Sequence, residues 1–231
     1  SRDVPDDALK RACYVLRFLM ADHSKIRQSF YKLYGRIAVI GLNENVTDLP
    51  EYSALPPDIN YRARGLGPTE AVPVVSGAEE NVLCYREDRY LGEDILLHEA
   101  AHGVHTAAQR ELSEWQRRLV ESFRKANASG LWSDTYSSTS VEEYMAEGVQ
   151  SFFGANAHSD PPDGVHGPVN TPEKLLQYDP DLYHLIELLF PCGNVFLKPC
   201  QSSRTTESEQ TLKMDCDVTG KYEFKMKSFL S

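Results

Sequence analysis

The sequence lacks several features that would each assign the chain to a particular class of protein. No run of about 18 apolar residues occurs, so we expect no membrane-spanning segment. There is no internal repeat, and no two cysteines have the close spacing of a zinc finger. Positive charge is in deficit, because 24 Lys and Arg oppose 34 Asp and Glu for a formal net charge of −10 at pH 7. This balance argues against nucleic acid or an anionic lipid surface as the main partner.

What remains is the composition of an ordinary globular protein. The 231 residues are 41% hydrophobic and 25% charged, which suits one large domain or one domain with an appendage. We expect a main domain over residues 1–191 and a disulfide-linked appendage, packed on it, over residues 192–231. The sequence leaves the oligomeric state open.

Five cysteines are scattered widely along the chain: Cys13, Cys84, Cys192, Cys200 and Cys216. Such scatter is more typical of disulfides in a secreted chain than of a metal cluster, and buried thiols in a cytosolic protein are the alternative. We expect one disulfide between Cys13 and Cys84 and another between Cys200 and Cys216, which leaves Cys192 unpaired. Connectivity itself does not follow from the sequence.

Two glycosylation sequons agree with an extracellular location. They are Asn45-Val46-Thr47 and Asn127-Ala128-Ser129, although sequons also arise often by chance. The sequence shows no signal-peptide pattern, so we expect that any such segment has been removed or was not included. We predict a secreted glycoprotein.

The strongest chemical signal is the stretch His98-Glu99-Ala100-Ala101-His102. On a helix, His98 and His102 lie one turn apart on the same face, where two imidazoles can bind one metal ion. Glu99 lies beside them, where it can take a proton from a metal-bound water. Apolar neighbours suit a helix buried in a core, and the alternative is an ordinary helix with two stacked histidines.

A third ligand is needed, and a second helix offers one. The metzincin pattern fails, because the residue six positions after His102 is Ala108. Glu143 and Glu147, by contrast, lie one turn apart at the start of a later helix, where two like charges favour a nearby cation. We expect Glu143 to bind the metal and Glu147 to accept the free ring N–H of His98 or His102. Glu142 is the rival ligand, and a solvated acidic helix N-terminus is the alternative interpretation.

Taken together, His98-Glu-Ala-Ala-His102 and Glu143-Tyr-Met-Ala-Glu147 resemble the gluzincin metallopeptidases. The nearest likeness is to catalytic domains of the anthrax-lethal-factor type, which also have a tyrosine seven residues before the ligand glutamate. Tyr136 stands at that place, whereas Met145 departs from the usual aromatic. The likeness covers roughly residues 90–155. It implies a zincin fold, with a twisted sheet over the metal-binding helix.

This interpretation gives a concrete chemical hypothesis. We predict a zinc-dependent endopeptidase with one zinc per chain on His98, His102 and Glu143, and a peptide or protein as substrate. Glu99 would act as general base and Tyr136 as donor to the oxyanion. The alternatives are a binding or toxin-like module on a zincin scaffold that has lost catalysis, and a zinc hydrolase acting on a non-peptide amide.

Three further histidines are expected to lie outside the mechanism. His105, one turn past His102, should pack at the end of its helix rather than bind metal. His158 and His166 lie in the loop after the glutamate helix, where either could reach the cleft as an auxiliary donor, and a structural role is favoured for both.

The wider pattern predicts an α+β fold that is mostly helical. Helices are expected over residues 6–20, 24–33, 92–108, 110–126, 141–153, 171–178 and 181–190. Strands are expected over 36–42, 72–75 and 81–84, with a turn at Gly77 between the last two and Pro73 confining one of them to an edge or irregular position. Residues 43–69 read as a long loop, and 218–229 as a weakly alternating part of the appendage.

Overall fold

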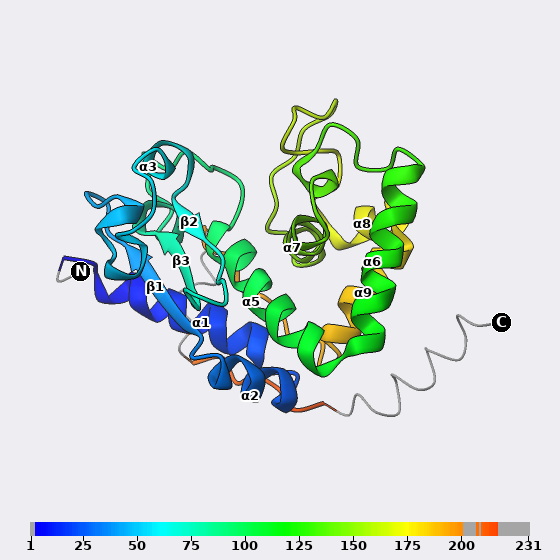
Figure 1. Ribbon diagram of the computed structural model, residues 1–231, viewed down its shortest axis with the longest axis horizontal. Helices are drawn as coiled ribbons and strands as arrows, with labels where there is room; N and C mark the ends of the chain where they lie inside the picture. Colours follow the sequence, from blue (N-terminus) through cyan, green and yellow to red (C-terminus); the bar gives the residue numbers. More distant parts are fainter. Residues whose placement is uncertain (1–2, 201–206, 208, 217–231) are drawn as a thin grey trace.

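A computed structural model describes residues 3–200, 207 and 209–216 (Figure 1). The fold is mixed α+β, mostly helical with one small sheet, as expected from the sequence. The helices are α1 (Asp6–Met20), α2 (Ser24–Lys32), α3 (Ile59–Arg62), α4 (Glu79–Val82), α5 (Ile95–Glu111), α6 (Ser113–Ala128), α7 (Val141–Phe152), α8 (Pro172–Tyr178) and α9 (Pro180–Leu189). The strands are β1 (Arg36–Ile40), β2 (Gly65–Leu66) and β3 (Val74–Ala78). Short 3-10 helices cover Val46–Asp48, Pro50–Tyr52 and Tyr136–Ser138.

The three strands form one sheet in the order β1-β3-β2. β1 pairs with β3 in parallel, with Arg36 opposite Val74, and β2 pairs with β3 antiparallel, with Leu66 opposite Ser76. The expected hairpin is therefore wrong, because β3 runs through Gly77 and residues 79–82 form α4. The edge position is wrong as well: β3 is central, and Pro73 precedes its first residue, so the missing N–H of Pro73 lies outside the strand.

Helix α5 lies at the centre of the molecule, between two lobes (Figure 1). The sheet-side lobe comprises residues 3–94, and the helical lobe comprises residues 113–190. Gly103 allows α2 and β3 to approach α5 closely, because a Cβ atom at this position would lie 3.2 Å from Phe30 and 3.3 Å from Val75. The sheet-side lobe thus packs directly on α5, and most of the buried apolar residues of both lobes form one continuous core. A second, smaller cluster lies in the sheet-side lobe and comprises Ile40, Val46, Leu49, Tyr52 and Val74.

Buried polar bonds hold α7 in the helical lobe. One carboxylate oxygen of Asp179 accepts from Trp132 Nε1 at 2.9 Å and from the Tyr144 hydroxyl at 2.6 Å. Its other oxygen accepts from Leu182 N at 3.0 Å and so caps α9. Tyr144 follows Glu143 on α7, so this network fixes the helix that carries the candidate ligand.

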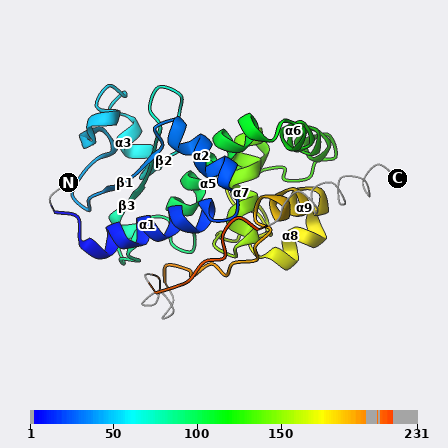
Figure 2. The ribbon, with the colours of Figure 1, turned by 90° about the horizontal axis from the view of Figure 1, so that it is seen from below.

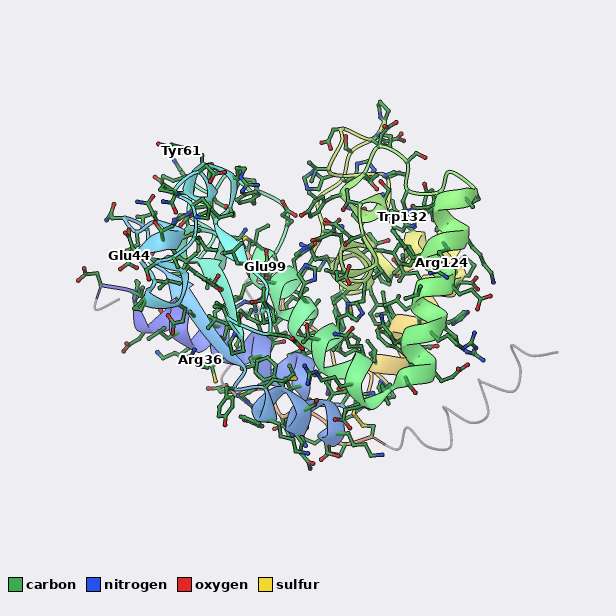
Figure 3. All side chains as sticks on the ribbon, in the orientation of Figure 1. Arg36, Glu44, Tyr61, Glu99, Arg124 and Trp132 are labelled. Carbon is green, nitrogen blue, oxygen red and sulfur yellow. A yellow bond between two sulfur atoms is a disulfide. The ribbon has the colours of Figure 1, made fainter. Side chains whose placement is uncertain are left out.

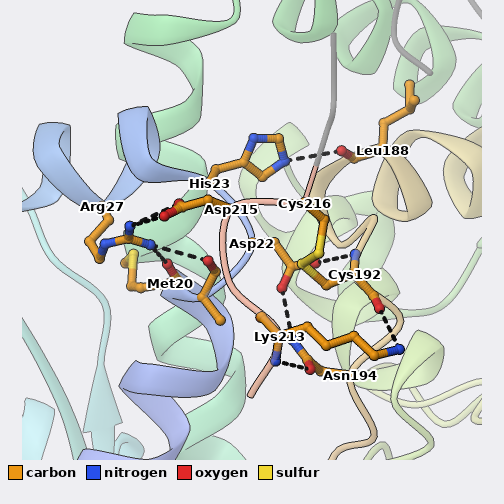
Figure 4. The surroundings of a disulfide bond; sticks show 11 residues. Met20, Asp22, His23, Arg27, Leu188, Cys192, Asn194, Lys213, Asp215 and Cys216 are labelled. Carbon is orange, nitrogen blue, oxygen red and sulfur yellow. Dashed lines mark hydrogen bonds and ion pairs between the residues drawn. A yellow bond between two sulfur atoms is a disulfide. The ribbon is translucent and has the colours of Figure 1, made fainter. Parts of the chain in front are cut away.

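Two disulfides are present among the described residues, but both pairings differ from those expected. Cys84 is bonded to Cys200, and Cys13 is free and exposed. Cys192 is bonded to Cys216 (Figure 4). Cys13 lies on the exposed face of α1. The disulfide pairing follows from the path of the chain, which returns along α1 after α9. The spacing of the cysteines in the sequence does not predict that path.

The described part of the C-terminal segment packs against α1 (Figure 2). Leu197 N donates to the Tyr14 hydroxyl at 2.8 Å, and the ring of Phe196 stacks on that of Tyr14 at 5.9 Å. Near the second disulfide, Cys192 N donates to Asp22 at 2.7 Å. The expected strand-like residues 218–229 lie outside the described residues, and the division into two domains at residue 191 stays a prediction. None of the helices described is long and apolar enough to cross a bilayer.

Candidate metal centre

A cleft of about 650 Å³ separates the two lobes, with α5 at its floor. Gly65 and Gly67 line the sheet side, and Tyr136, Glu143 and Val165 line the helical side. Figure 3 shows Glu99 on α5, between the lobes. The residues that the motifs single out therefore face one shared space.

Two histidines from α5 and one glutamate from α7 converge in this cleft. His98 Nε2 lies 3.0 Å from Glu143 Oε2 and 3.1 Å from His102 Nε2, and His102 Nε2 lies 3.4 Å from the same glutamate oxygen. Ligands at about 2.0–2.1 Å from a tetrahedral zinc stand about 3.3–3.4 Å apart, so the triangle has nearly the required size. These three atoms could hold one metal ion with a fourth position open.

The helix N-terminus explains why Glu143 points into the cleft. Ser140 caps α7 by accepting from Glu143 N at 3.2 Å. The Glu143 side chain turns toward His98 and His102 rather than back to its own helix. Glu142, the rival ligand, is exposed and makes no contact with either histidine among the described hydrogen bonds and ion pairs.

The electrostatics of the triangle favour a cation. Burial opposes a charge on His98, yet the hydrogen bond that Glu143 accepts from it and the charges of Glu99 and Glu147 raise the pKa of His98 to about 10. Burial likewise opposes the Glu143 carboxylate, but its hydrogen bonds with His102 and His98 hold its pKa well below the usual range. A metal ion would supply the positive charge that a shared proton supplies here.

Glu99 lies beside the triangle, with a carboxylate oxygen within 4.8 Å of the ring nitrogens of His98 and His102. Burial raises the pKa of Glu99, against the opposing charges of the two histidines. A side chain at Gly67 would lie 3.0 Å from His102 Cβ and 3.2 Å from Glu99 Oε2, so a glycine lets the chain after β2 lie over both. Glu99 is thus enclosed between α5 and the chain at Gly67, and its raised pKa suits a general base.

The partner of His98 differs from the expected one. His98 Nδ1 lies 2.8 Å from Gln150 Oε1 and 3.5 Å from Glu147 Oε1, so the amide makes the shorter contact. Gln150 Nε2 donates to the carbonyl of Asp94 at 3.1 Å, which fixes the amide orientation. Its oxygen must accept, so His98 Nδ1 carries the proton and Nε2 is left for a metal.

Sequence reasoning missed Gln150, although a signal existed. Gln150 lies one helical turn after Glu147 and so shares its face of α7. Glu147 instead accepts from Asn156 Nδ2 at 2.9 Å and contributes charge near His98. The neutral amide of Gln150 therefore contacts the His98 imidazole directly, and the Glu147 carboxylate lies farther from it.

Tyr136 lies at the mouth of the cleft in its 3-10 helix. Its side chain is 39% exposed, and its ring centroid lies 6.4 Å from that of His98. Burial of the rest of the side chain, followed by the charge and hydrogen bond of Glu143, raises the pKa of Tyr136 to about 12. The hydroxyl stays protonated at neutral pH and can donate a hydrogen bond beside the triangle.

The remaining histidines have partners elsewhere or lie apart from the triangle. His105 Nε2 lies 2.8 Å from the side-chain oxygen of Gln116, and the ring packs on Trp115, as its expected packing role requires. His166 Nε2 lies 3.3 Å from Glu93 Oε1. His158 lines a separate shallow hollow on the helical lobe.

Comparison with known protein families, with characterised proteins and with solved structures gives no match. The likeness to gluzincins therefore depends on the motif residues alone, and the site has to be argued from its own geometry.

Proposed function

We propose that the chain is a zinc-dependent endopeptidase with a zincin-like site and one zinc ion per chain. The observation that carries the proposal is the triangle of His98 Nε2, His102 Nε2 and Glu143 Oε2, with sides of 3.0, 3.1 and 3.4 Å. When bound, zinc would polarise the scissile carbonyl and make a water molecule acidic enough to attack near neutral pH.

The residues around the triangle divide the remaining work. Glu99 removes a proton from the attacking water as its oxygen bonds to the scissile carbon, and passes that proton to the amine as the C–N bond breaks. Tyr136 donates a hydrogen bond to the oxyanion. Gln150 holds His98 in the tautomer that leaves Nε2 free.

A peptide can bind by adding to β2, an edge of the described sheet. β2 runs alongside α5 in the same direction, since Gly65 approaches Ile95 and Gly67 approaches His102. A peptide antiparallel to β2 would therefore place its N-terminal part beside the later turns of α5.

The charges along the cleft suggest a substrate preference. Near those later turns Glu142 is exposed, affects His105 electrostatically and forms no ion pair among the described residues. At the other side of the cleft, Arg64 is already neutralised by Glu80 at 2.6 Å. The proposed substrate accordingly carries a Lys or Arg on the N-terminal side of the scissile bond.

An extracellular location completes the proposal. Two disulfides are consistent with an oxidising compartment. Both sequon asparagines, Asn45 and Asn127, are exposed, as glycosylation requires.

The test combines zinc content with cleavage of a peptide library, with and without chelator. One zinc per chain and chelator-sensitive cleavage are expected, and Glu99→Gln should keep zinc but lose activity by roughly 10²–10⁴-fold. Glu111→Gln, an exposed carboxylate at the far end of α5, is the matched control and should behave as wild type. Unchanged cleavage in Glu99→Gln would overturn the mechanism, and bound zinc with no cleavage would favour a binding module.

A further inference from the structure

A buried guanidinium lies behind the candidate metal centre, on the side away from the cleft. Arg11 of α1 is only 1% exposed. Its Nη2 donates to Asp94 Oδ2 at 2.7 Å, and its Nη1 donates to Glu207 Oε1 and to the Leu197 carbonyl, both at 2.5 Å. One side chain thus joins the segment before α5 to the C-terminal segment.

Asp94 links the Arg11 contacts to α5, the helix that carries His98 and His102. Its second carboxylate oxygen accepts from Leu97 N at 2.9 Å and caps α5. Its backbone N–H donates to the Ala155 carbonyl at 2.9 Å, just past the end of α7. Its own carbonyl accepts from His98 N and from Gln150 Nε2, each at 3.1 Å. Every polar group of Asp94 therefore helps to fix the start of α5 or its position against α7.

A continuous chain of hydrogen bonds follows from these contacts. It runs from Glu207 through Arg11 and Asp94 to Gln150, and from Gln150 Oε1 to His98 Nδ1 at 2.8 Å. All of these side chains are buried, so the bonds act in a medium of low dielectric where loss of one partner is costly.

The C-terminal segment is well placed to carry the outer end of this chain. Cys200 is bonded to Cys84, and the ring of Phe196 lies 4.9 Å below the Arg11 guanidinium. Without Glu207, Asp94 would be the remaining charged partner of Arg11 among the described residues, and Arg11 would compete harder with the Leu97 N–H for that carboxylate. The cap of α5 and the carbonyl that orients Gln150 would then be free to shift.

We propose that the C-terminal segment is a working part of the metal centre rather than an appendage. Glu207 and Arg11 are positioning residues: they hold Asp94, and Asp94 holds both the first turn of α5 and the Gln150 amide that orients His98. This inference rests on the proposed metal site for its effect on zinc, and on the contacts alone for its effect on the helix.

The experiment uses the full chain with Glu207→Gln, and Glu209→Gln as the matched control. Glu209 is exposed and lies two residues away, so its variant removes the same charge without touching Arg11. We measure the zinc dissociation constant by chelator competition, the visible spectrum of the cobalt-loaded protein, and hydrogen exchange at the Leu97 and His98 amides of metal-free protein.

Glu207→Gln should raise the zinc dissociation constant about tenfold, in the range seen when outer partners of metal ligands are removed. It should also shift the cobalt bands and speed exchange at Leu97 and His98 relative to the centre of α5. Glu209→Gln should change none of these. A merely structural loss would speed exchange throughout the molecule and leave the cobalt bands in place.

Wild-type affinity, spectrum and local exchange in Glu207→Gln would overturn the inference. Should the wild-type chain bind no zinc, the proposed function fails, and the exchange measurement still decides whether Glu207 holds the start of α5.

Discussion

Two buried charged clusters flank the first turns of α5: Asp94 with Arg11 behind the helix, and His98 with His102 and Glu143 in the cleft. They differ in whether their polar atoms have matching hydrogen-bond partners. In the cluster behind the helix, both carboxylate oxygens of Asp94 and both terminal nitrogens of Arg11 have partners of opposite polarity. In the cleft, His98 Nε2 and His102 Nε2 face each other at 3.1 Å, so at most one of the two can donate. The first cluster is complete as the chain folds, whereas the second brings acceptors together around a point that needs a cation.

This is the difference expected between a structural cluster and the proposed metal site. A structural ion pair needs its members to match one another, and a metal site needs several electron-pair donors of similar kind to converge. Removing Arg11 or Asp94 from the cluster behind α5 should therefore destabilise the fold. Removing a ligand from the cleft should mainly abolish metal binding.

The sharpest test of this contrast removes a cleft histidine. His102→Ala should reduce zinc from one per chain to none, because two ligands hold zinc far more weakly than three. Metal analysis after dialysis measures it, with His105→Ala as the control from the next turn of α5. Full zinc in His102→Ala would show that the cleft histidines are not the ligands.

The next effect separates binding from chemistry within the cleft. Tyr136→Phe should leave zinc in place and slow turnover by roughly 10²-fold or more, because it removes one donor to the oxyanion. Turnover and KM on a cleaved library peptide are compared with wild type. Full activity would exclude Tyr136 from the mechanism.

A smaller effect tests the link between the clusters. Gln150→Leu keeps the volume but removes both the acceptor for His98 Nδ1 and the donor to Asp94. Zinc affinity should fall by roughly 10–100-fold, while Gln177→Leu, on the surface of α8, should leave it unchanged. Equal affinity of the two variants would mean that the amide does not orient the imidazole.

The smallest expected effect concerns an ion pair at the edge of the cleft. The contact with Glu93, whose Oε1 lies 3.3 Å from His166 Nε2, outweighs partial burial and raises the pKa of His166 to about 9. Because the folded pKa exceeds the unfolded one, the pair stabilises the fold fully below about pH 6.5. That contribution is lost as pH rises through about 9.

Denaturant unfolding of metal-free wild type and His166→Gln from pH 6 to 10 measures the contribution of the pair to the free energy of unfolding. Wild type should be more stable by about 1 kcal/mol or less at low pH, since the pair is partly exposed, and the difference should vanish near pH 10. A difference that grows with pH would contradict the assignment.

The sequence predicted what is local and failed where distant segments meet. The apolar spacing of Ala8, Ala12, Val15 and Leu19 marks α1 over Asp6–Met20, as the structure has it. The i, i+4 spacing of His98 and His102 likewise fixes their shared face without knowledge of the fold. Such features depend only on the geometry of one helix.

Other features depend on how the chain returns on itself. Short apolar runs at 72–75 and 81–84 suit a strand or a buried helix turn equally, and the first two residues of the second run form the end of α4. The disulfide partners were wrong because Cys84 and Cys200 are 116 residues apart in sequence and meet only after α9. Gln150 was missed because its position one turn after Glu147 indicates the right face of α7, but not which side chain on that face contacts His98.

The most direct measurement of the central claim is X-ray absorption at the zinc edge of the wild-type chain loaded with one equivalent of zinc. We predict one tightly bound zinc with two imidazole nitrogens and carboxylate or water oxygens at about 2.0–2.2 Å, and no sulfur. Failure to bind zinc stoichiometrically, or a shell that contains cysteine sulfur, would contradict it.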